Sequence, residues 1–325
     1  MKSSAACYYR CPICNSKFEI QDAEYMQNEI NRGILCCKQN HMYAIVDGVP
    51  IFLEDKKMDT ISCQTSHIFR KEWTWFKDYS ANNLPDLLAP VSEFNTNGLL
   101  ILDAGCGAGR HLIKLGPMAK IAFGIDLSEA TKVAYNRTYS FHNIHIAQAN
   151  LYQLPFNKKS FDVIYSIGVL HHLDDPEYGF RKLTEYLRPG GLIVFWVYNR
   201  TIRKQVLDKV RLLSTKFPAG VNYWIAFIIA SFEFFILCKG YYYLSRQKSL
   251  ERFVEHFTPE RVKEYSQYQF TESHADWFDR LSPPISRFYN VNDIQSWFKN
   301  ICNQFIWWRV GKIKDSWIYG IGQTL

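Results

Sequence analysis

The chain has 325 residues, of which 47% are hydrophobic and 21% charged, so its composition excludes wholesale disorder. Its length suits one large domain with a smaller one beside it. The net charge of +7 is concentrated in residues 200–325, which hold 18 basic and 11 acidic side chains. A solvated basic face and a surface for an anionic partner both account for this asymmetry.

The first ten residues, MKSSAACYYR, lack the apolar core of a secretory signal. Nine cysteines without such a signal favour a reducing compartment, and their odd number argues against a framework made only of disulfides. We therefore expect a cytoplasmic protein.

Two pairs of metal-binding residue types lie in the first sixty residues. Cys11 and Cys14 form a C-x2-C pair, and Cys37 and His41 form a C-x3-H pair further along. Such pairs are typical of a structural zinc site whose four protein ligands leave no open position for catalysis. Cys36 competes with Cys37 for the third position, and Cys37 is preferred because its spacing to His41 is tighter. The metal would supply stability that so small a module cannot gain from its core.

A glycine-rich turn follows the apolar run at residues 99–102. Its members are Asp103, Gly105, Gly107 and Gly109. The pattern predicts a strand, a tight turn and a helix. A carboxylate here would repel a pyrophosphate but attract an ammonium or sulfonium group, and S-adenosylmethionine (SAM) carries both cations. The glycines allow the backbone to approach the ligand closely, and the thiol of Cys106 within the turn is expected to be inert.

Further strands are predicted at residues 121–125, 144–147, 161–166 and 192–197. Asp126 ends the first of these and would take the ribose hydroxyls, while Leu127 would pack on the adenine. Asn150 lies where its amide could bond the adenine edge. The carboxyl ends of parallel strands meet at one edge of a sheet, so these residues should converge. The residues expected to contact SAM are Asp103, Gly105, Cys106, Gly107, Asp126, Leu127, Asn150, Leu151 and Ile167.

The motifs LDAGCGAGRHL, FGIDLSEA, ANLYQLPF, SFDVIYSIGVLHHLDDP and YLRPGGLIVFWVY resemble those of class I SAM-dependent methyltransferases of the domain 11 type, over residues 97–200. The resemblance implies an α/β, Rossmann-like sandwich with a seven-stranded sheet whose last strand is antiparallel. It also implies that Asp103 and the glycines receive the methionine end of SAM and that Asp126 takes the ribose. Asn150 departs from the family pattern, which usually has an Asp there.

Residues 8–54 are similar to the zinc ribbons that activate tRNA methyltransferases and to the N-terminal ribbon of bacterial 23S rRNA guanine methyltransferases. We therefore expect a zinc-ribbon domain at 1–58 and a methyltransferase domain at 59–325. An aromatic helix at 66–76 resembles the lead-in of ribbon-bearing methyltransferases. It would either pack over the cofactor pocket or form a lid that touches SAM through Trp75 or Phe76.

Residues 200–290 fit a helical insertion between the fifth and sixth strands, where this fold places acceptor specificity. The candidates for the acceptor pocket are Tyr198, His274, Arg280 and Tyr289. His171 and Asp279 are weak candidates for a catalytic base, which is needed only if the acceptor must lose a proton. Each of these side chains also has an ordinary structural interpretation.

The apolar segment 223–238 is short for a membrane-spanning helix and contains Glu233. It is interpreted first as a packing helix, then as a helix at a membrane surface, and last as a span. The sequence leaves the oligomeric state open.

Three functions remain in competition. The first is methyl transfer to a small-molecule, glycan or lipid-linked acceptor held under the C-terminal insertion, which the aromatic insertion favours. The second is methylation of an rRNA or tRNA base, which the ribbon and the basic C-terminal third favour. The third is a SAM-binding scaffold without activity, against which the intact glycine motif argues.

Overall fold

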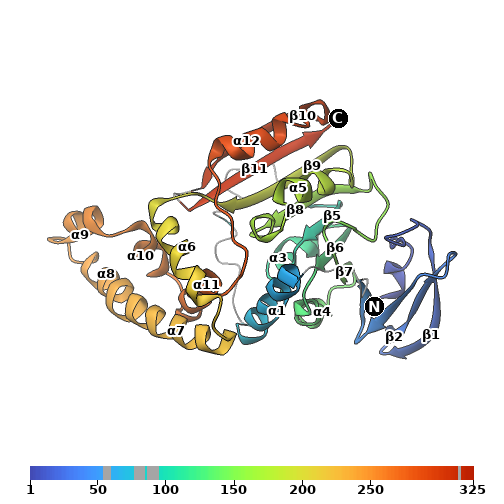
Figure 1. The fold of residues 1–325 in the computed structure, drawn as a ribbon, viewed down its shortest axis with the longest axis horizontal. Helices are drawn as coiled ribbons and strands as arrows, with labels where there is room; N and C mark the ends of the chain where they lie inside the picture. The colour runs from blue at the N-terminus through green and yellow to red at the C-terminus, as the bar shows by residue number, and fades with distance from the viewer. Residues whose placement is uncertain (54–59, 77–84, 86–94, 314–315) are drawn as a thin grey trace.

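The computed structural model describes residues 1–53, 60–76, 85, 95–313 and 316–325 (Figure 1). Within this part of the chain, the strands form one sheet in the order β1-β2-β3-β4-β7-β6-β5-β8-β9-β11-β10. The strands are β1 Phe18–Met26, β2 Glu29–Cys37, β3 Met42–Val46, β4 Val49–Phe52, β5 Leu100–Ala104, β6 Ile121–Asp126, β7 Ile144–Ala149, β8 Phe161–Ile167, β9 Leu187–Tyr198, β10 Phe305–Ile313 and β11 Trp317–Thr324.

Strands β5 to β11 form a Rossmann-like half. Strands β7, β6, β5, β8 and β9 are parallel neighbours, whereas β11 pairs antiparallel with both β9 and β10. The central strands are buried along nearly their whole length, as expected of a parallel sheet covered on both faces. The predicted α/β fold, with seven strands and an antiparallel last strand, is confirmed.

Strands β1 to β4 form an antiparallel meander from the N-terminal module. The short strand β4 then pairs in parallel with β7, where Ile51 faces Gln148, so the meander continues the larger sheet. The meander and the larger sheet share one core, in which the fully buried ring of Tyr9 packs against Phe123 and Phe156. The predicted division at 58/59 lies outside the described residues.

Helices cover the sheet and extend from it. Those around the sheet are α1 Thr60–Trp75, α3 Leu112–Leu115, α4 Ala130–Thr138, α5 Pro176–Thr184 and α12 Val291–Lys299, with 3-10 turns at Ser3–Ala5, Gly116–Met118, Leu170–His172 and Cys302–Gln304. The capping box of α12 uses Asn290 and Asp293, which fixes the start of this helix. Strand β9 also begins earlier than predicted, because residues 188–191 continue the strand through an irregular pairing with β8.

The segment between β9 and β10 is the predicted insertion, and it forms a helical lobe to one side of the sheet (Figure 1). Its elements are α6 Ile202–Ser214, α7 Ala219–Ser231, a π-helical stretch Phe232–Cys238, α8 Lys239–Leu244, α9 Glu251–Phe257, α10 Glu260–Tyr265 and α11 Phe270–Leu281. Helix α11 packs against α6 and α7 within the lobe and also contacts α1.

The apolar segment of the lobe is longer than predicted. Helix α7, the π-helical stretch and α8 run on as one helix, Ala219–Leu244, of 26 residues. By length and composition this helix is apolar enough to cross a membrane, although a third of its apolar window is buried against the protein. The packing interpretation therefore accounts for only one of its faces.

Candidate functional site

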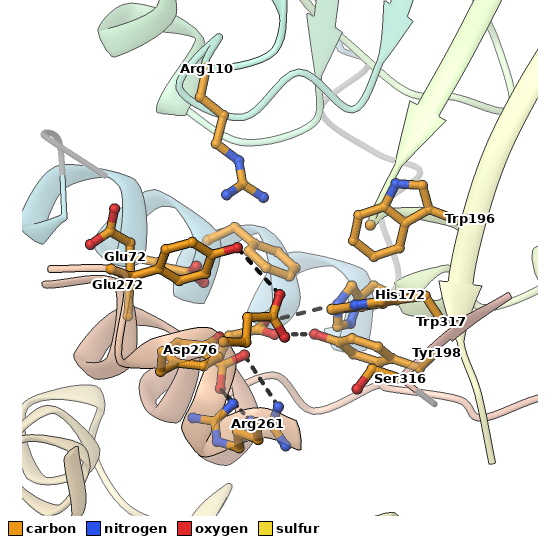
Figure 2. Close-up of a pocket in the computed structure, with 18 of the residues that line it drawn as sticks. Glu72, Arg110, His172, Trp196, Tyr198, Arg261, Glu272, Asp276, Ser316 and Trp317 are labelled. Atoms are coloured by element: carbon orange, nitrogen blue, oxygen red, sulfur yellow. Dashed lines mark hydrogen bonds and ion pairs between the residues drawn. The ribbon is translucent and has the colours of Figure 1, made fainter. Parts of the chain in front are cut away.

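A cavity of about 180 Å³ lies between the carboxyl ends of the parallel strands and the helical insertion (Figure 2). Its wall on the sheet side includes Arg110 after β5, Gly168 after β8 and Tyr198 at the end of β9. Helices α1, α10 and α11 supply the other side. The cavity is therefore where ligands of open α/β sheets bind. Its lining is Phe69, Glu72, Trp73, Arg110, Gly168, His172, Trp196, Tyr198, Thr201, Arg261, Glu264, Tyr265, Tyr268, Glu272, Ala275, Asp276, Asp279, Arg280, Ser316 and Trp317.

The glycine-rich turn after β5 borders this space and needs glycine at two positions. Gly105 has φ +92°, and a Cβ there would lie 2.4 Å from Val169. Gly107 has φ +50°, and a Cβ there would lie 2.8 Å from Nε1 of Trp73. The amides of Gly105 and Cys106 both donate to the carbonyl of Ile125 at 2.8 Å, which holds the turn against β6. The turn thus offers bare backbone to a ligand.

Asp103, the predicted partner of a cationic ligand, is a buried carboxyl group with an incomplete set of hydrogen bonds. Its side chain is 1% exposed, and its Oδ2 has no hydrogen-bond partner among the described residues. Burial raises the pKa of Asp103 to about 8, and the nearby charge of Asp126 adds to this shift. A cation beside Oδ2 would relieve both effects, so the site fits the ammonium of SAM.

Asp126, the last residue of β6, is engaged by the protein itself. Its Oδ2 accepts from the amide of Gly107 at 2.9 Å, and its Oδ1 accepts from the amide and hydroxyl of Ser128 at 2.8 and 2.6 Å. It therefore fixes the glycine turn relative to β6. A carboxylate has about four acceptor positions, so capacity for a ribose hydroxyl remains.

The other predicted SAM contacts lie at neighbouring strand ends. Asn150 directly follows β7, and its Oδ1 accepts from the amide of Tyr152 at 2.9 Å. Leu151 and Ile167 are buried apolar side chains, and the backbone carbonyl of Leu127 accepts from Gln148. Burial raises the pKa of the Cys106 thiol well above its usual value, which agrees with an inert role.

Helix α1 contributes to the cavity through residues that the sequence did not single out. Phe69, Glu72 and Trp73 line it, and the guanidinium of Arg110 lies 5.3 Å from the Trp73 ring. Trp75 and Phe76, the proposed lid residues, instead pack on Tyr223 and Phe278 in the insertion. These two rings do not line the cavity, so they do not act as the expected lid. The residues of α1 that reach the cavity lie just before them in the helix.

Glu72 is an acid held at the cavity wall in a buried position. Burial raises its pKa well above the ordinary value, and the nearby charge of Asp279 acts in the same direction. Its Oε2 has no hydrogen-bond partner among the described residues. A protonated Glu72 can therefore donate to a ligand or accept from one.

The two histidines after β8 differ in position. His171 is fully buried, does not line the cavity, and packs its ring 4.0 Å from that of Tyr198. His172 does line the cavity, and its Nδ1 lies 2.7 Å from the carbonyl of Ile285. Because a carbonyl can only accept, Nδ1 carries the proton and Nε2 of the neutral ring is an acceptor. The geometry thus favours His172 over the predicted His171 as a base.

Asp279, the other candidate base, lies opposite Nε2 of His172. The distance from Asp279 Oδ1 to that nitrogen is 4.0 Å, and Asp279 Oδ2 accepts from the hydroxyl of Tyr198 at 2.5 Å. Burial lowers the pKa of His172, although the charge of Asp279 partly opposes that shift. Two acceptors on the cavity wall thus stand at a separation that one donor group could bridge.

The four predicted acceptor-pocket residues divide into two groups. Tyr198 and Arg280 line the cavity. His274 is buried away from it, where Nε2 bonds the carbonyl of Tyr223 at 3.0 Å and the ring packs against Phe76. Tyr289 also lies outside the cavity lining and packs on Trp297. The structure therefore corrects the placement of His274 and Tyr289, which support the lobe and its junction with the sheet.

An ion-pair network forms the floor of the cavity (Figure 2). Asp276 pairs with Arg261 at 2.6 Å and with Arg280 at 2.5 Å, and Arg261 also binds Glu233 at 2.7 and 2.9 Å. Burial would raise the pKa of Asp276, but the two guanidinium groups outweigh it and hold that pKa below its usual range. Sequence patterns do not reveal this network, because its members lie on three separate helices.

The four predicted zinc ligands form one cluster in the N-terminal module. Their ligand atoms all lie within 4.8 Å of one another. Sγ of Cys37 lies 3.3 Å from Nδ1 of His41 and 3.6 Å from Sγ of Cys14, while Sγ of Cys11 lies 3.5 Å from Nδ1. Cys36 is outside the cluster, because successive side chains of β2 point to opposite faces.

Comparison with known proteins agrees with a Rossmann-like methyltransferase fold. Residues 102–195 match the family described as a methyltransferase domain. A stretch of 123 residues is 40% identical to an uncharacterized protein of Synechococcus sp., covering 35% of this chain and 29% of that protein. A stretch of 98 residues is 37% identical to the tRNA U34 carboxymethyltransferase of Pseudoalteromonas atlantica, covering 29% of this chain and 30% of that protein.

Among solved structures, a SAM-dependent methyltransferase from Mesorhizobium loti is 32% identical, with a TM-score of 0.34 over 38% of this chain and 55% of that one. The chain spans about 30% of the length of the two curated relatives described above. The matched region contains β5 to β8 and most of β9, together with the glycine turn and Asp126. Residues 102–195 are therefore similar to a methyltransferase domain.

Proposed function

We propose that the protein transfers a methyl group from SAM to a small-molecule, glycan or lipid-linked acceptor that enters the cavity beneath the insertion. One observation carries this proposal: the cavity is bounded on one side by the predicted methyl-donor site and on the other by α10 and α11. Trp73 joins the two, because its indole lies against Gly107 and also lines the cavity. An acceptor in this space would lie beside the donor, and proximity supplies much of the rate enhancement in such a reaction.

The residues of the predicted donor site have functional groups that are complementary to the parts of SAM. Asp103 would receive its ammonium, Gly105 and Gly107 would let the backbone approach it, and Asn150 would offer its amide to the adenine. Asp126 would hold the glycine turn and accept from the ribose. Bound SAM supplies an electrophilic methyl group and leaves as a neutral thioether.

His172 and Asp279 would prepare the acceptor. The hydroxyl of an acceptor could donate to Nε2 of His172 or to Oδ1 of Asp279, which are 4.0 Å apart. Nε2 would take the hydroxyl proton as the new oxygen–carbon bond forms, and the Asp279 carboxylate would stabilise the imidazolium. Tyr198 would orient that carboxylate through its hydrogen bond. The aromatic wall and the mixture of acids and arginines suit an acceptor with both apolar and polar parts.

The experiment that tests this function combines turnover with SAM binding. Labelled SAM is incubated with fractionated extract and with protein carrying His172→Gln, Asp279→Asn or Tyr198→Phe. We expect label in the lipid or small-molecule fraction, a loss of roughly 10²–10⁴-fold in His172→Gln, and unchanged SAM affinity. His67→Gln, at an exposed position of α1 outside the cavity lining, serves as the matched control. Full activity in His172→Gln would contradict the proposed base.

A second function is favoured by a separate observation. Several relatives are named tRNA U34 carboxymethyltransferase, which suggests RNA as the acceptor. The basic excess of residues 200–325 is consistent with a polyanionic partner. Label in the RNA fraction, together with binding that weakens steeply as salt rises, would establish this alternative and exclude a small acceptor.

We also propose that Cys11, Cys14, Cys37 and His41 hold a structural zinc ion. Three thiolates and one imidazole are a common closed zinc set, and the compact cluster supports it. Residues 1–58 would then act as a zinc-ribbon domain attached to a methyltransferase domain at 59–325, in a cytoplasmic protein.

A further inference from the structure

The long helix Ala219–Leu244 presents an apolar stripe to solvent. Val221, Trp224, Ile228, Phe232 and Phe235 recur every three or four residues, which places them on one face. Trp224 is 61% exposed, Ile228 67%, Phe232 58% and Phe235 61%. In Figure 1 this helix runs along the outer edge of the lobe, away from the sheet. Single exposed apolar residues are ordinary, but a continuous row of large ones marks an interaction surface.

Apolar side chains continue the stripe at both ends of the helix. Leu212, Leu213 and Phe217 precede it by a few residues and are 70%, 64% and 48% exposed. Phe253 and Phe257 follow on α9 and are 63% and 68% exposed. We call the stripe and these flanking residues the apolar face.

The exposed charges at the two ends of the long helix are basic. Lys216 lies at its start, and Arg246 and Lys248 lie at its end, all exposed. Between residues 212 and 250 the sequence has a single acid, Glu233, which is buried and paired with Arg261. The stripe on the long helix thus has basic residues at both ends and no exposed acid of its own, whereas Glu251 and Glu255 are exposed on the neighbouring α9. This stripe is complementary to a lipid surface that carries anionic headgroups.

The opposite face of the helix is fixed to the protein. Glu233 accepts from Arg261, from Trp277 Nε1 at 2.7 Å and from the hydroxyl of Ser273 at 3.2 Å. Asn222 donates to the carbonyl of Ser214 at 2.9 Å. Spanning a bilayer would expose these polar groups to hydrocarbon, which is strongly unfavourable for each group left without a hydrogen bond. The helix is therefore suited to lie in the plane of the interface.

We propose that the apolar face docks the insertion onto the surface of an anionic phospholipid bilayer. This inference does not depend on the methyl-transfer function. It nevertheless has a consequence for that function, because Arg261 joins Glu233 on the inner side of the helix to Asp276 at the cavity floor. The long helix and the Arg261 side chain would then separate the bilayer from the cavity floor.

Vesicle flotation with the full-length chain tests the proposal. We expect flotation with vesicles of phosphatidylcholine and phosphatidylglycerol, and weaker flotation with phosphatidylcholine alone. The triple variant Ile228→Asn, Phe232→Gln, Phe235→Gln should lose at least ten-fold in bound fraction. The pair Lys216→Glu, Lys248→Glu should lose the preference for anionic vesicles. Unchanged thermal unfolding and SAM binding would show that both variants are folded.

A matched control changes exposed apolar residues elsewhere. Met42→Gln and Ile306→Gln alter side chains that are 65% and 57% exposed on β3 and β10, and flotation should not change. Failure of the wild-type chain to float would overturn the proposal. So would flotation that survives the triple variant. A dimer that the triple variant dissociates, in a chain that binds no vesicles, would assign the apolar face to a second copy instead.

Discussion

The indole of Trp73 lies directly against the backbone of Gly107, where a Cβ would come within 2.8 Å of Nε1. The contact joins helix α1 to the glycine turn. It also brings an aromatic ring of the cavity lining up to the predicted donor site.

Replacement of Gly107 should therefore damage SAM binding by more than backbone strain alone. Gly107→Ala puts a methyl group against the indole at φ +50°, so we expect SAM affinity to fall at least ten-fold, as measured by calorimetry. Gly98→Ala is the control, because Gly98 has φ +70° but nothing within 4 Å of its Cβ position. That variant should lose about 1 kcal/mol of stability and keep its SAM affinity. Equal loss of affinity in both variants would argue against the contact.

The raised pKa of Asp103 predicts a pH dependence of SAM binding. Burial lifts this pKa to about 8, so the carboxyl is largely protonated at pH 7 in the free protein, whereas a bound ammonium favours the carboxylate. Binding should release a proton, and affinity should rise as pH increases from 6 to 8. The charged or titratable neighbours are Asp126, Arg110 and Tyr165.

Calorimetry in buffers of different ionisation enthalpy would count the released proton. Asp103→Asn should bind SAM more weakly and abolish the pH dependence between 6 and 8. If the variant kept the wild-type slope, another group would be responsible.

The same shift has a consequence for stability. The folded-state pKa is raised above the unfolded value of 3.8, so between about pH 4 and 8 the folded state holds a proton that the unfolded state has lost. The contribution of Asp103 to stability therefore decreases as pH rises through this range. SAM should offset that decrease by binding to the folded state.

The zinc cluster predicts different outcomes for two adjacent cysteines. Cys37→Ser should lose the metal and lower the melting temperature, because Sγ of Cys37 lies within the ligand cluster. Cys36→Ser should keep both, because its side chain points to the other face of β2. Metal content by mass spectrometry and thermal unfolding of the two purified variants would decide this. Loss of metal in Cys36→Ser alone would reverse the choice.

Glu233 predicts how the insertion responds to the loss of one charge. Glu233→Gln leaves Arg261 with a weaker partner in a buried position, so we expect a loss of about 3 kcal/mol in the free energy of unfolding. Glu251→Gln, at an exposed position on α9, should change it by less than about 0.5 kcal/mol. Urea denaturation would compare the two, and equal effects would show that the ion pair contributes little.

The same ion pair makes the stability of the insertion depend on pH in the acid range. The hydrogen bond and charge of Arg261 outweigh burial and lower the pKa of Glu233 below 4.5 in the folded state. This contribution is complete above pH 4.5 and disappears as pH falls through the lowered value. The insertion should therefore loosen before the sheet does in acid.

The sequence predicted the sheet well because its signals are local. Apolar runs that end in Asp103 and Asp126 mark strands whose burial on both faces leaves little choice of structure. The four predicted zinc ligands form one cluster for the same reason, since their spacing along the chain is typical of residues that share one ion. Tyr198 and Asp279 line the cavity, since one ends β9 and the other lies on the insertion, and their roles in the reaction stay predictions.

The rest of the site depends on how helices pack, which spacing alone does not determine. The aromatic helix suggested contacts from Trp75 and Phe76, but its orientation turns Glu72 and Trp73 toward the cavity. His171 and His172 are adjacent, yet the bend after β8 buries one and directs the other into the cavity. His274 is a polar residue on α11, and its bond to the Tyr223 carbonyl places it among the aromatic rings of the lobe.

The pairing of β4 with β7 means that the N-terminal module protects one edge of the larger sheet. A parallel sheet that ended at β7 would offer a row of unpaired backbone groups to other chains. Ile51 and Phe52 occupy part of that row by facing Gln148 and Ala149, and the next residue, Asn150, is the predicted adenine contact. Removing the N-terminal module would thus expose β7 as an aggregation-prone edge strand. It would also leave the predicted adenine contact, Asn150, less firmly held. The N-terminal module thus continues the larger sheet past β7.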